Sequence, residues 1–264
     1  MNVISELTGI GFDRVSVLDG ADCGVEARRL VLAFIRYEAA AGPESLYGGA
    51  VIHPYYPVSQ AAYRAARQWT DSCRKAGLQV RLAPEVRVKP IFARLTFLRT
   101  GRNTLAYLPE TGSRFHVQIF LADEDWEVTD RLTEPRAPEC GECKKCREAC
   151  PTGAIGEREF DPERCLRYWM LNGQTPPDFI REHMGNRLIG CDLCQACCPM
   201  NRPGTAKPLT VSLEKLMDGS AVGELRPLIG SNYARKGRLR LQAEVILSSL
   251  GQTRKESVNE TPAD

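Results

Sequence analysis

The alternation of apolar and polar positions predicts mixed α/β structure in the first half of the chain. Ala50–Ile52 and Val80–Leu82 are apolar runs of strand length, and Val58–Ala76 between them is predicted to be a helix. Arg28–Ala41 is predicted to form another helix, which the pair Gly42-Pro43 ends. Along the helix between the two strands, apolar residues recur every four positions, at Ala61, Ala65 and Trp69.

The pattern changes further along the chain. Phe115–Val128 is predicted to be extended around Val117–Leu121, with an acidic turn at Asp123–Asp125. Two prolines in Leu132–Pro138 mark a linker, and Asn232–Leu250 has apolar residues at helical spacing. We therefore expect four consecutive segments: an α/β domain over residues 1–135, a cysteine-rich module over 136–205, a helical tail over 206–250 and a disordered end over 251–264.

Composition and charge narrow the class of protein only slightly. The chain has 264 residues, of which 43% are hydrophobic and 26% charged, and its net charge is +2. This ordinary globular balance does not indicate binding to nucleic acid or to a membrane. No apolar run approaches the roughly 18 residues that span a bilayer, and the N-terminus shows no signal-peptide pattern. We expect a cytoplasmic protein with no membrane partner, in which clustered thiols stay reduced and bind metal.

The cysteines are concentrated in one short part of the sequence. Nine of the eleven lie between Cys140 and Cys198, whereas Cys23 and Cys73 stand alone and are expected to be small, buried apolar residues. The run Cys140–Pro151 has the bacterial ferredoxin spacing C-x₂-C-x₂-C-x₃-C-P. In that arrangement three thiolates bind one 4Fe–4S cluster and the fourth binds the other cluster.

The second cysteine run is one ligand short. Cys191–Pro199 fits the last three cysteines of the same spacing, but Leu188 stands where the first cysteine is expected. Cys165, between the two runs, can supply the missing thiolate, which leaves Cys197 unused. By this count, one cluster is bound by Cys140, Cys143, Cys146 and Cys198, and the other by Cys150, Cys165, Cys191 and Cys194.

Other uses of these cysteines are less favoured. Neither C-x₃-C-P ending is typical of zinc sites. A radical-SAM motif that starts at Cys194 needs a third cysteine where Asn201 stands. Disulfides are rare in the expected compartment. Cys197 could replace Cys198 as a ligand, although the proline after Cys198 favours the latter.

Asp123 is the strongest candidate for acid–base chemistry among the other polar residues. It follows an apolar strand, where a carboxyl group can project into a cleft and have its pKa raised by burial. The alternative, which spacing alone favours, is an ordinary turn residue. The histidines lie far apart and fit a strand end, a sheet face and a solvated loop; they are His53, His116 and His183.

The sequence around the cysteines carries more than their spacing. Gly185–Asn201 reads G-N-R-L-I-G-C-D-L-C-Q-A-C-C-P-M-N, Cys140–Ala154 ends in P-T-G-A, and Cys165–Tyr168 reads C-L-R-Y. This module resembles that of epoxyqueuosine reductases, the tRNA-modifying relatives of reductive dehalogenases, whose corresponding motifs include G-N-R-x-x-G-C-D-x-C-Q-x-x-C-P-W-N and C-I-S-Y. The resemblance implies that Cys165 is a cluster ligand, in agreement with the count.

The resemblance also covers two segments upstream of the cysteines. Gly101–Leu105 is similar to the family's G-K-N-T-L, and Gly112–Asp123 is similar to its G-S-W…T-D element. The aspartate of that element is the family's proposed proton donor, so the resemblance implies this role for Asp123. It also implies cobalamin as a cofactor, with contacts from Gly101, Asn103, Arg167 and Tyr168.

Several features depart from the family's pattern. After Tyr55-Tyr56 the chain enters a helix almost directly, where the family has a longer insertion, and the family's loop G-L-G-x-x-G-K-N is contracted to Arg99–Asn103. The C-terminal helical repeats that help the family to bind tRNA are largely absent. Three residues replace the family's lysine, serine and tryptophan, namely Arg102, Arg167 and Met200.

Together these features imply an α+β protein: a cobalamin-reductase-like α/β domain, a bacterial two-cluster ferredoxin-like module and a short helical tail. The implied reaction takes electrons from a reduced ferredoxin or flavodoxin-type donor through the clusters to cobalamin, and removes an epoxide oxygen during queuosine synthesis in tRNA. Phosphate contacts are expected from Arg235, Lys236, Arg238 and Arg240. Two alternatives stay open, a ferredoxin-like carrier without cobalamin and a cobalamin-dependent reductase of a small molecule.

Overall fold

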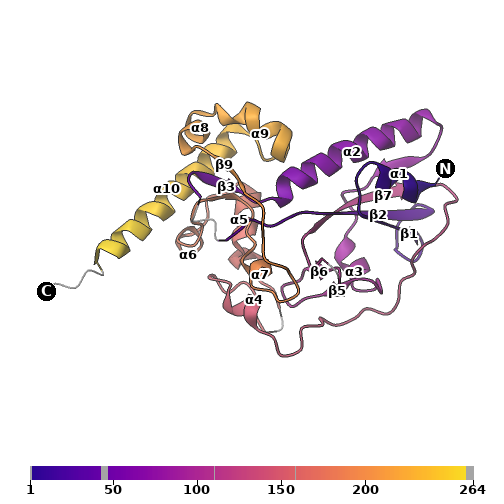
Figure 1. Cartoon of the computed structure of the whole chain (residues 1–264), viewed down its shortest axis with the longest axis horizontal. Helices are drawn as coiled ribbons and strands as arrows, with labels where there is room; N and C mark the ends of the chain where they lie inside the picture. Colours follow the sequence, from indigo (N-terminus) through magenta and orange to yellow (C-terminus); the bar gives the residue numbers. More distant parts are fainter. Residues whose placement is uncertain (1, 43–46, 110, 158, 260–264) are drawn as a thin grey trace. The chain divides into compact units, whose positions relative to one another are not determined.

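Two compact units make up the chain in the computed structural model, which describes residues 2–42, 47–109, 111–157 and 159–259 (Figure 1). The first unit comprises Met1–Tyr37, Val58–Cys143 and Pro199–Arg202, and the second comprises Glu38–Pro57, Lys144–Cys198 and Pro203–Asp264. The units interleave along the chain, so they do not coincide with the four consecutive segments expected from the sequence. No helix within the described residues is both long and apolar enough to cross a membrane.

The first unit is built on a four-stranded antiparallel sheet with the strand order β1-β2-β7-β4. Its strands are β1 (Arg14–Asp19), β2 (Arg29–Arg36), β4 (Val80–Leu82) and β7 (Phe115–Ala122). The other elements of this unit are α1 (Val3–Gly9), most of α2 (Tyr55–Lys75), α3 (Val88–Phe92) and the hairpin of β5 (Arg99–Thr100) and β6 (Ala106–Tyr107). The predicted strands at β4 and β7 and the predicted helix at α2 are confirmed.

Strand β2 occupies the segment for which the sequence predicted a helix, and that prediction is wrong. Every side chain from Leu30 to Phe34 is fully buried, because β2 lies between β1 and β7 and both of its faces are covered. Val31 and Ala33 pack into the core on one face, and the alternate residues pack into the core on the other. A strand buried on both faces is a continuous apolar run, which periodicity does not separate from a buried helix. Pro43, the expected stop, lies outside the described residues.

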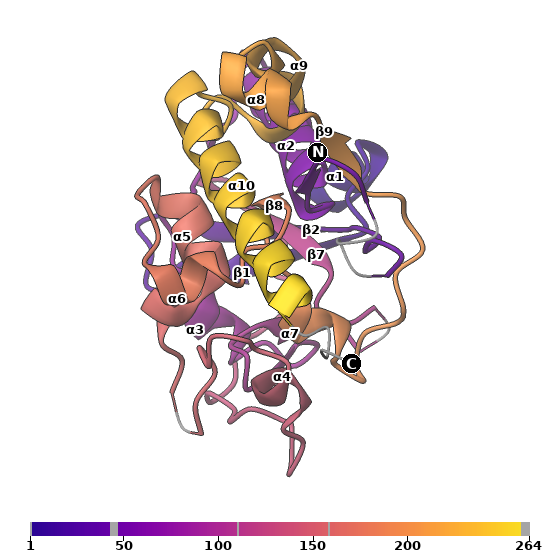
Figure 2. The ribbon, with the colours of Figure 1, turned by 90° about the vertical axis from the view of Figure 1, so that its left-hand side faces the viewer.

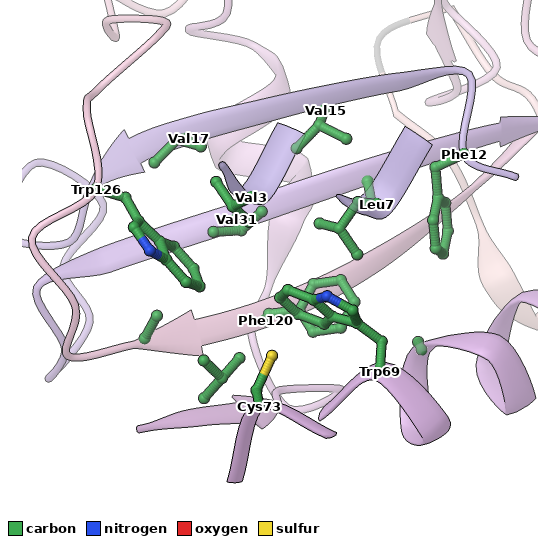
Figure 3. Close-up of a cluster of buried hydrophobic side chains, with 14 of the residues drawn as sticks. Val3, Leu7, Phe12, Val15, Val17, Val31, Trp69, Cys73, Phe120 and Trp126 are labelled. Atoms are coloured by element: carbon green, nitrogen blue, oxygen red, sulfur yellow. The ribbon is translucent and has the colours of Figure 1, made fainter. Parts of the chain in front are cut away.

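Helices α1 and α2 cover one face of this sheet (Figure 3). The buried side of α2 is turned by one residue from the predicted one, since Ala61 is exposed and Ala62 is buried. Trp69 determines this side: its indole N–H donates to the Glu6 carboxylate at 2.8 Å, and its ring packs edge-on against Phe120. A large aromatic side chain contributes far more buried area than the alanines. Four residues form the buried stripe, Ala62, Ala66, Trp69 and Cys73, which confirms that Cys73 is a buried apolar residue.

The second unit contains a three-stranded sheet with the order β8-β3-β9. Its strands are β8 (Arg187–Ile189), β3 (Ala50–Ile52) and β9 (Leu209–Val211). Its helices are α4 (Lys145–Glu148), the 3₁₀ helix η2 (Pro162–Arg164), α5 (Leu166–Asn172), α6 (Asp178–Arg181), α7 (Leu193–Ala196), α8 (Leu213–Asp218), α9 (Ala221–Ile229) and α10 (Lys236–Asn259). Figure 2 shows α10 running alongside α8, and it also contacts β8 and α6.

Helix α10 extends beyond the predicted helical tail. The sequence predicted a helix over Asn232–Leu250 and disorder over 251–264, whereas α10 runs to Asn259. The expected disorder is therefore wrong for residues 251–259, and residues 260–264 lie outside the described part of the chain. Buried residues on α10, such as Leu239, Ala243 and Ile246, pack into the core of the second unit and explain why the first half of this helix forms.

His116, a partly buried residue on β7, should make the stability of the protein depend on pH. Burial lowers the pKa of His116 to about 4, whereas an unfolded histidine titrates near pH 6.5. The unfolded state therefore binds more protons between these values, and the free energy of unfolding should fall by about 3 kcal/mol as the pH drops from about 6.5 to about 4. Replacing His116 with Gln should flatten this dependence in unfolding followed by circular dichroism. His183→Gln, which changes an exposed histidine, is the control; the same fall in both variants would contradict the assignment.

Candidate iron–sulfur centre

Four cysteines that the sequence assigned to one cluster approach one another in the second unit. Short turns deliver them: Cys165 caps the start of α5, Cys191 follows β8, and Cys194 lies in α7. Burial raises the pKa of the Cys194 thiol, and its charge interactions with neighbouring thiols raise it further. These neighbours are Cys191, Cys165, Cys146 and Cys150. Cys194 therefore lies near thiols that the count assigned to both clusters, and the division of the ligands between two clusters stays a prediction.

The thiols of this site suit a group that binds thiolates. Burial raises the pKa of Cys191 to about 12, an effect that the Arg187 guanidinium opposes, and a metal that binds such a thiol displaces its proton. The backbone N–H of Ala154 donates to Cys150 Sγ at 3.3 Å, as cluster sulfurs require. The donor set thus fits an iron–sulfur cluster.

A buried histidine and an aspartate support the turn that carries Cys191. The His53 backbone N–H donates to the Ile189 carbonyl at 3.0 Å, and His53 Nδ1 accepts from the Tyr55 N–H at 3.2 Å. The opposite ring nitrogen, Nε2, lies 3.6 Å from Asp192 Oδ2. The sequence predicted His53 only as a residue at a strand end, which is where it lies, directly after β3. Its proximity to Asp192 was not predicted, because the two residues are far apart in the chain.

The peptide that follows Cys198 is held by the turn before β7. Asn201 Oδ1 accepts from the Ser113 N–H at 2.8 Å, and Asn201 Nδ2 donates to Ser113 Oγ at 3.1 Å. A Cβ on Gly112 would overlap Asn201 Oδ1, so only glycine allows this approach. The Gly-Ser pair and the last Asn of the cysteine motif, which the sequence showed as separate segments, thus form one set of contacts within the first unit.

Gly101 and Asn103, two of the residues expected to contact a cofactor, make their contacts inside a tight loop of the first unit. Asn103 is buried, and its Nδ2 donates to the Tyr107 hydroxyl at 2.7 Å while its Oδ1 accepts from the Leu105 N–H at 3.3 Å. A Cβ on Gly101 would lie 2.7 Å from Tyr107 Cε2 and 2.8 Å from Asn103 Oδ1. The space beside Gly101 is therefore filled by this chain's own side chains.

The other two expected cofactor contacts lie on α5 in the second unit. The Arg167 guanidinium stacks over two tyrosine rings, 5.0 Å from the centroid of Tyr55 and 5.9 Å from that of Tyr56. Burial raises the pKa of the Tyr56 hydroxyl to about 12, which Arg167 opposes. Tyr168 is exposed. Arg167 therefore has a structural contact of its own, and Tyr168 presents its ring to solvent.

Asp123 lies at the end of β7 and not in the buried cleft that was one of the two interpretations left open by the sequence. It follows the last residue of β7, and its side chain is exposed. Its Oδ1 accepts from the backbone N–H of Arg28 at 3.1 Å, and its own N–H donates to the Gln79 carbonyl at 3.0 Å. Its exposure agrees with the alternative of a turn residue, because β7 ends at Ala122, directly before Asp123.

The basic cluster at the start of α10 is only partly available for phosphates. Arg238 donates to the carbonyls of Met170 and Leu171 in the last turn of α5. Its guanidinium also stacks over the Tyr233 ring. Burial lowers the pKa of Arg238. Arg238 is thus a helix-capping residue, which leaves three exposed members of the predicted set: Arg235, Lys236 and Arg240.

Comparison with known families gives the class of this site. Residues 139–201 match the family described as 4Fe-4S double cluster binding domain. The chain therefore carries an iron–sulfur cluster binding domain, and the matched residues contain all of the cysteines that the count assigned to clusters.

Comparison with individual proteins confirms the resemblance to epoxyqueuosine reductases. The enzyme of Listeria monocytogenes is 38% identical over 103 residues, which are 39% of this chain and 26% of that protein. The enzyme of Escherichia coli is 41% identical over 106 residues, which are 39% of this chain and 27% of that protein. The matched part spans about a quarter of these relatives.

Solved structures extend the likeness of the fold to most of the chain. An epoxyqueuosine reductase from Bacillus subtilis superposes with a TM-score of 0.68 at 19% identity, over 95% of this chain and 81% of that one. A catabolic reductive dehalogenase superposes with a TM-score of 0.53 at 18% identity, over 94% of this chain and 35% of that one. The predicted mixed α/β fold is confirmed, and the finer arrangement of domains stays a prediction.

Proposed function

We propose that this chain is an iron–sulfur reductase that passes electrons through two 4Fe–4S clusters and removes an epoxide oxygen during queuosine synthesis in tRNA. The observation that carries this proposal is the match of residues 139–201 to the family described as 4Fe-4S double cluster binding domain, together with the similarity to epoxyqueuosine reductases. One solved neighbour is an epoxyqueuosine reductase with an epoxyqueuosine-modified tRNA stem loop, which supports tRNA as the substrate class.

The reaction needs a source of single electrons and a source of protons. Removing the epoxide oxygen as water breaks two C–O bonds, leaves an alkene, and consumes two electrons and two protons. Clusters deliver electrons one at a time, and we propose a reduced ferredoxin or flavodoxin as the donor. The exposed residues Arg235, Lys236 and Arg240 are the candidates for tRNA phosphate contacts.

Cobalamin is the expected electron acceptor, but two of its expected contacts do not fit. When bound, it would supply a redox-active cobalt for C–O cleavage, and one neighbour is a reductive dehalogenase whose structure suggests a mechanism for B12-dependent dehalogenation. Asn103 uses its amide inside its own loop, and Tyr107 fills the space beside Gly101. The polar groups of the Asn103 side chain are thus used within its own loop, which does not fit a contact with cobalamin, and we derive no step through the cofactor.

Asp123 is the proposed proton donor to the departing oxygen. Its side chain is exposed, and the Arg28 N–H donates to Oδ1 and thereby fixes the carboxyl group at the end of β7. A solved relative from Bacillus subtilis has its catalytic aspartate loop swung out of the active site. An exposed aspartate at this position is consistent with such a loop.

A cobalamin titration of the anaerobically purified protein tests the proposal. Binding, followed by its absorbance and the cobalt EPR signal, together with turnover of epoxyqueuosine-containing tRNA, is the expected result. Asp123→Asn should then abolish turnover and leave the iron content unchanged. Asp125→Asn is the matched control, since it removes a carboxylate two residues away that pairs with Arg29. Normal turnover in Asp123→Asn would remove the assigned role.

A ferredoxin-like electron carrier without cobalamin is the second candidate function. The observation that favours it is the commitment of Asn103 and Gly101 inside their loop. This candidate would be supported if the protein binds no cobalamin while its clusters can still be reduced and reoxidised. Cobalamin binding without turnover on tRNA would instead favour a small-molecule substrate.

A further inference from the structure

We propose that the Gly101–Leu105 loop belongs to the binding site of the cluster that Cys140 ligates, and that Arg102 raises the reduction potential of this cluster. The inference rests on the proposed clusters. It gives this loop a task other than the cofactor contact that the family resemblance implied, and it concerns contacts within the first unit alone.

Arg102 reaches the cysteine turn with both its backbone and its side chain. Its backbone N–H donates to Cys140 Sγ at 3.2 Å, and its Nη2 donates to the Gly141 carbonyl at 3.1 Å. A third link runs from the Glu139 N–H to the Thr100 carbonyl at 3.0 Å. The loop therefore holds the residues on both sides of Cys140 and directs one N–H at its sulfur.

The loop is built so that this N–H keeps its direction. Gly101 N–H donates to the Leu105 carbonyl and Thr104 N–H donates to the Gly101 carbonyl, both at 2.9 Å. Thr104 has a φ of +60°, the one positive φ among the non-glycine residues that the structure describes. Such a conformation persists only where the surroundings enforce it. The buried Asn103 amide supplies that restraint through Tyr107 and Leu105.

Both donors of Arg102 favour the reduced cluster. Reduction adds a negative charge to the cluster and its sulfurs, and an N–H bond to a ligand sulfur stabilises that charge. The Arg102 guanidinium donates to the carbonyl of Gly141, the residue after Cys140, and so keeps one positive charge beside the cysteine turn. The family's lysine carries the charge as well, but an arginine holds it in a fixed planar geometry.

Two replacements separate these contributions. Arg102→Ala keeps the backbone N–H and removes the guanidinium, whereas Arg102→Pro removes the N–H as well. Lys89→Ala is the matched control, because it removes a positive charge whose Nζ donates to the Thr104 side chain at 3.0 Å, whereas Arg102 donates to the cysteine turn itself. Each protein is purified anaerobically, its iron is measured, and its clusters are titrated by EPR-monitored reduction.

We expect Arg102→Ala to lower one of the two potentials, Arg102→Pro to lower the same one further, and Lys89→Ala to leave both unchanged. The affected signal should be the one that survives in Cys165→Ala, which keeps only the Cys140 cluster. If Arg102→Pro loses its iron, the shift in Arg102→Ala decides. Unshifted potentials in Arg102→Ala, or an equal shift in Lys89→Ala, would overturn the proposal.

The same measurements distinguish this inference from the proposed function. A shifted potential in a protein that never reduces epoxyqueuosine-containing tRNA would support the role of Arg102 and sink the proposed reaction. Turnover of the tRNA, with unshifted potentials in both Arg102 variants, would support the proposed reaction and overturn the role of Arg102. A protein that binds no iron would overturn both.

Discussion

Replacing Cys165 with alanine should remove one of the two clusters and lower the iron content from about eight to about four ions per chain. Cys165 lies outside both cysteine runs, yet its thiol interacts with those of Cys191 and Cys194. Its loss leaves three thiolates for a cluster that needs four, and a cubane with an open iron site is readily lost. Iron analysis and the EPR spectrum of the reduced protein measure the effect.

Cys197→Ala is the matched control for this prediction. Cys197 lies directly before Cys198 in the second run, and the count of ligands leaves it unused. We expect this variant to keep both clusters. A Cys197→Ala protein that loses half of its iron, beside a Cys165→Ala protein that retains all of it, would show that the count assigned the wrong ligand.

Replacing Gly190 with alanine should both remove a cluster and lower the stability of the fold. Gly190 has a φ of +94°, and a Cβ there would overlap His53 Cβ and lie 2.9 Å from Tyr56 Cε2. Both neighbours are buried, so the turn that carries Cys191 must move instead. We expect loss of the Cys191 cluster and a destabilisation of about 3 kcal/mol or more.

Gly173→Ala separates the clash from the backbone conformation. Gly173 has a φ of +74° and no atom within 4 Å of its hypothetical Cβ, so its replacement costs only the left-handed conformation, about 1 to 2 kcal/mol. This variant should retain all of its iron. Similar iron content and similar thermal unfolding in the two variants would show that the contact with His53 does not position Cys191.

The fold could be predicted where one face of an element is buried, and not where both faces are. The strand at β7 and the helix at α2 carry the periodicity of their half-buried surfaces. β2 has no polar face, because β1 and β7 flank it and cores cover both sides. The phase of α2 was also missed at its alanines, where Ala62 and Ala66 are buried instead of Ala61 and Ala65, because alanines on neighbouring faces of a helix look alike in the sequence.

Functional residues could likewise be predicted from local spacing, but not where their environment depends on distant segments. The grouping of Cys150, Cys165, Cys191 and Cys194 could be counted, because cluster ligands obey short, local spacings. The environment of Asp123 could not, since its exposure depends on where β7 ends. Arg238, expected to contact phosphate, proved to cap α5 through carbonyls that lie more than 60 residues away in the chain.

The amino-acid sequence alone indicated the iron–sulfur chemistry and the resemblance to epoxyqueuosine reductases, and it predicted Cys165 as the missing ligand of the second run, because spacing and residue type suffice for such predictions. The tertiary structure decided what each supporting residue does. It showed Arg102 directed at Cys140, Asn103 committed to Tyr107, and His53 behind Cys191. Such roles depend on contacts between segments that are distant in the sequence. A single hydrogen bond or close steric contact of this kind produces no periodic pattern from which it could be predicted.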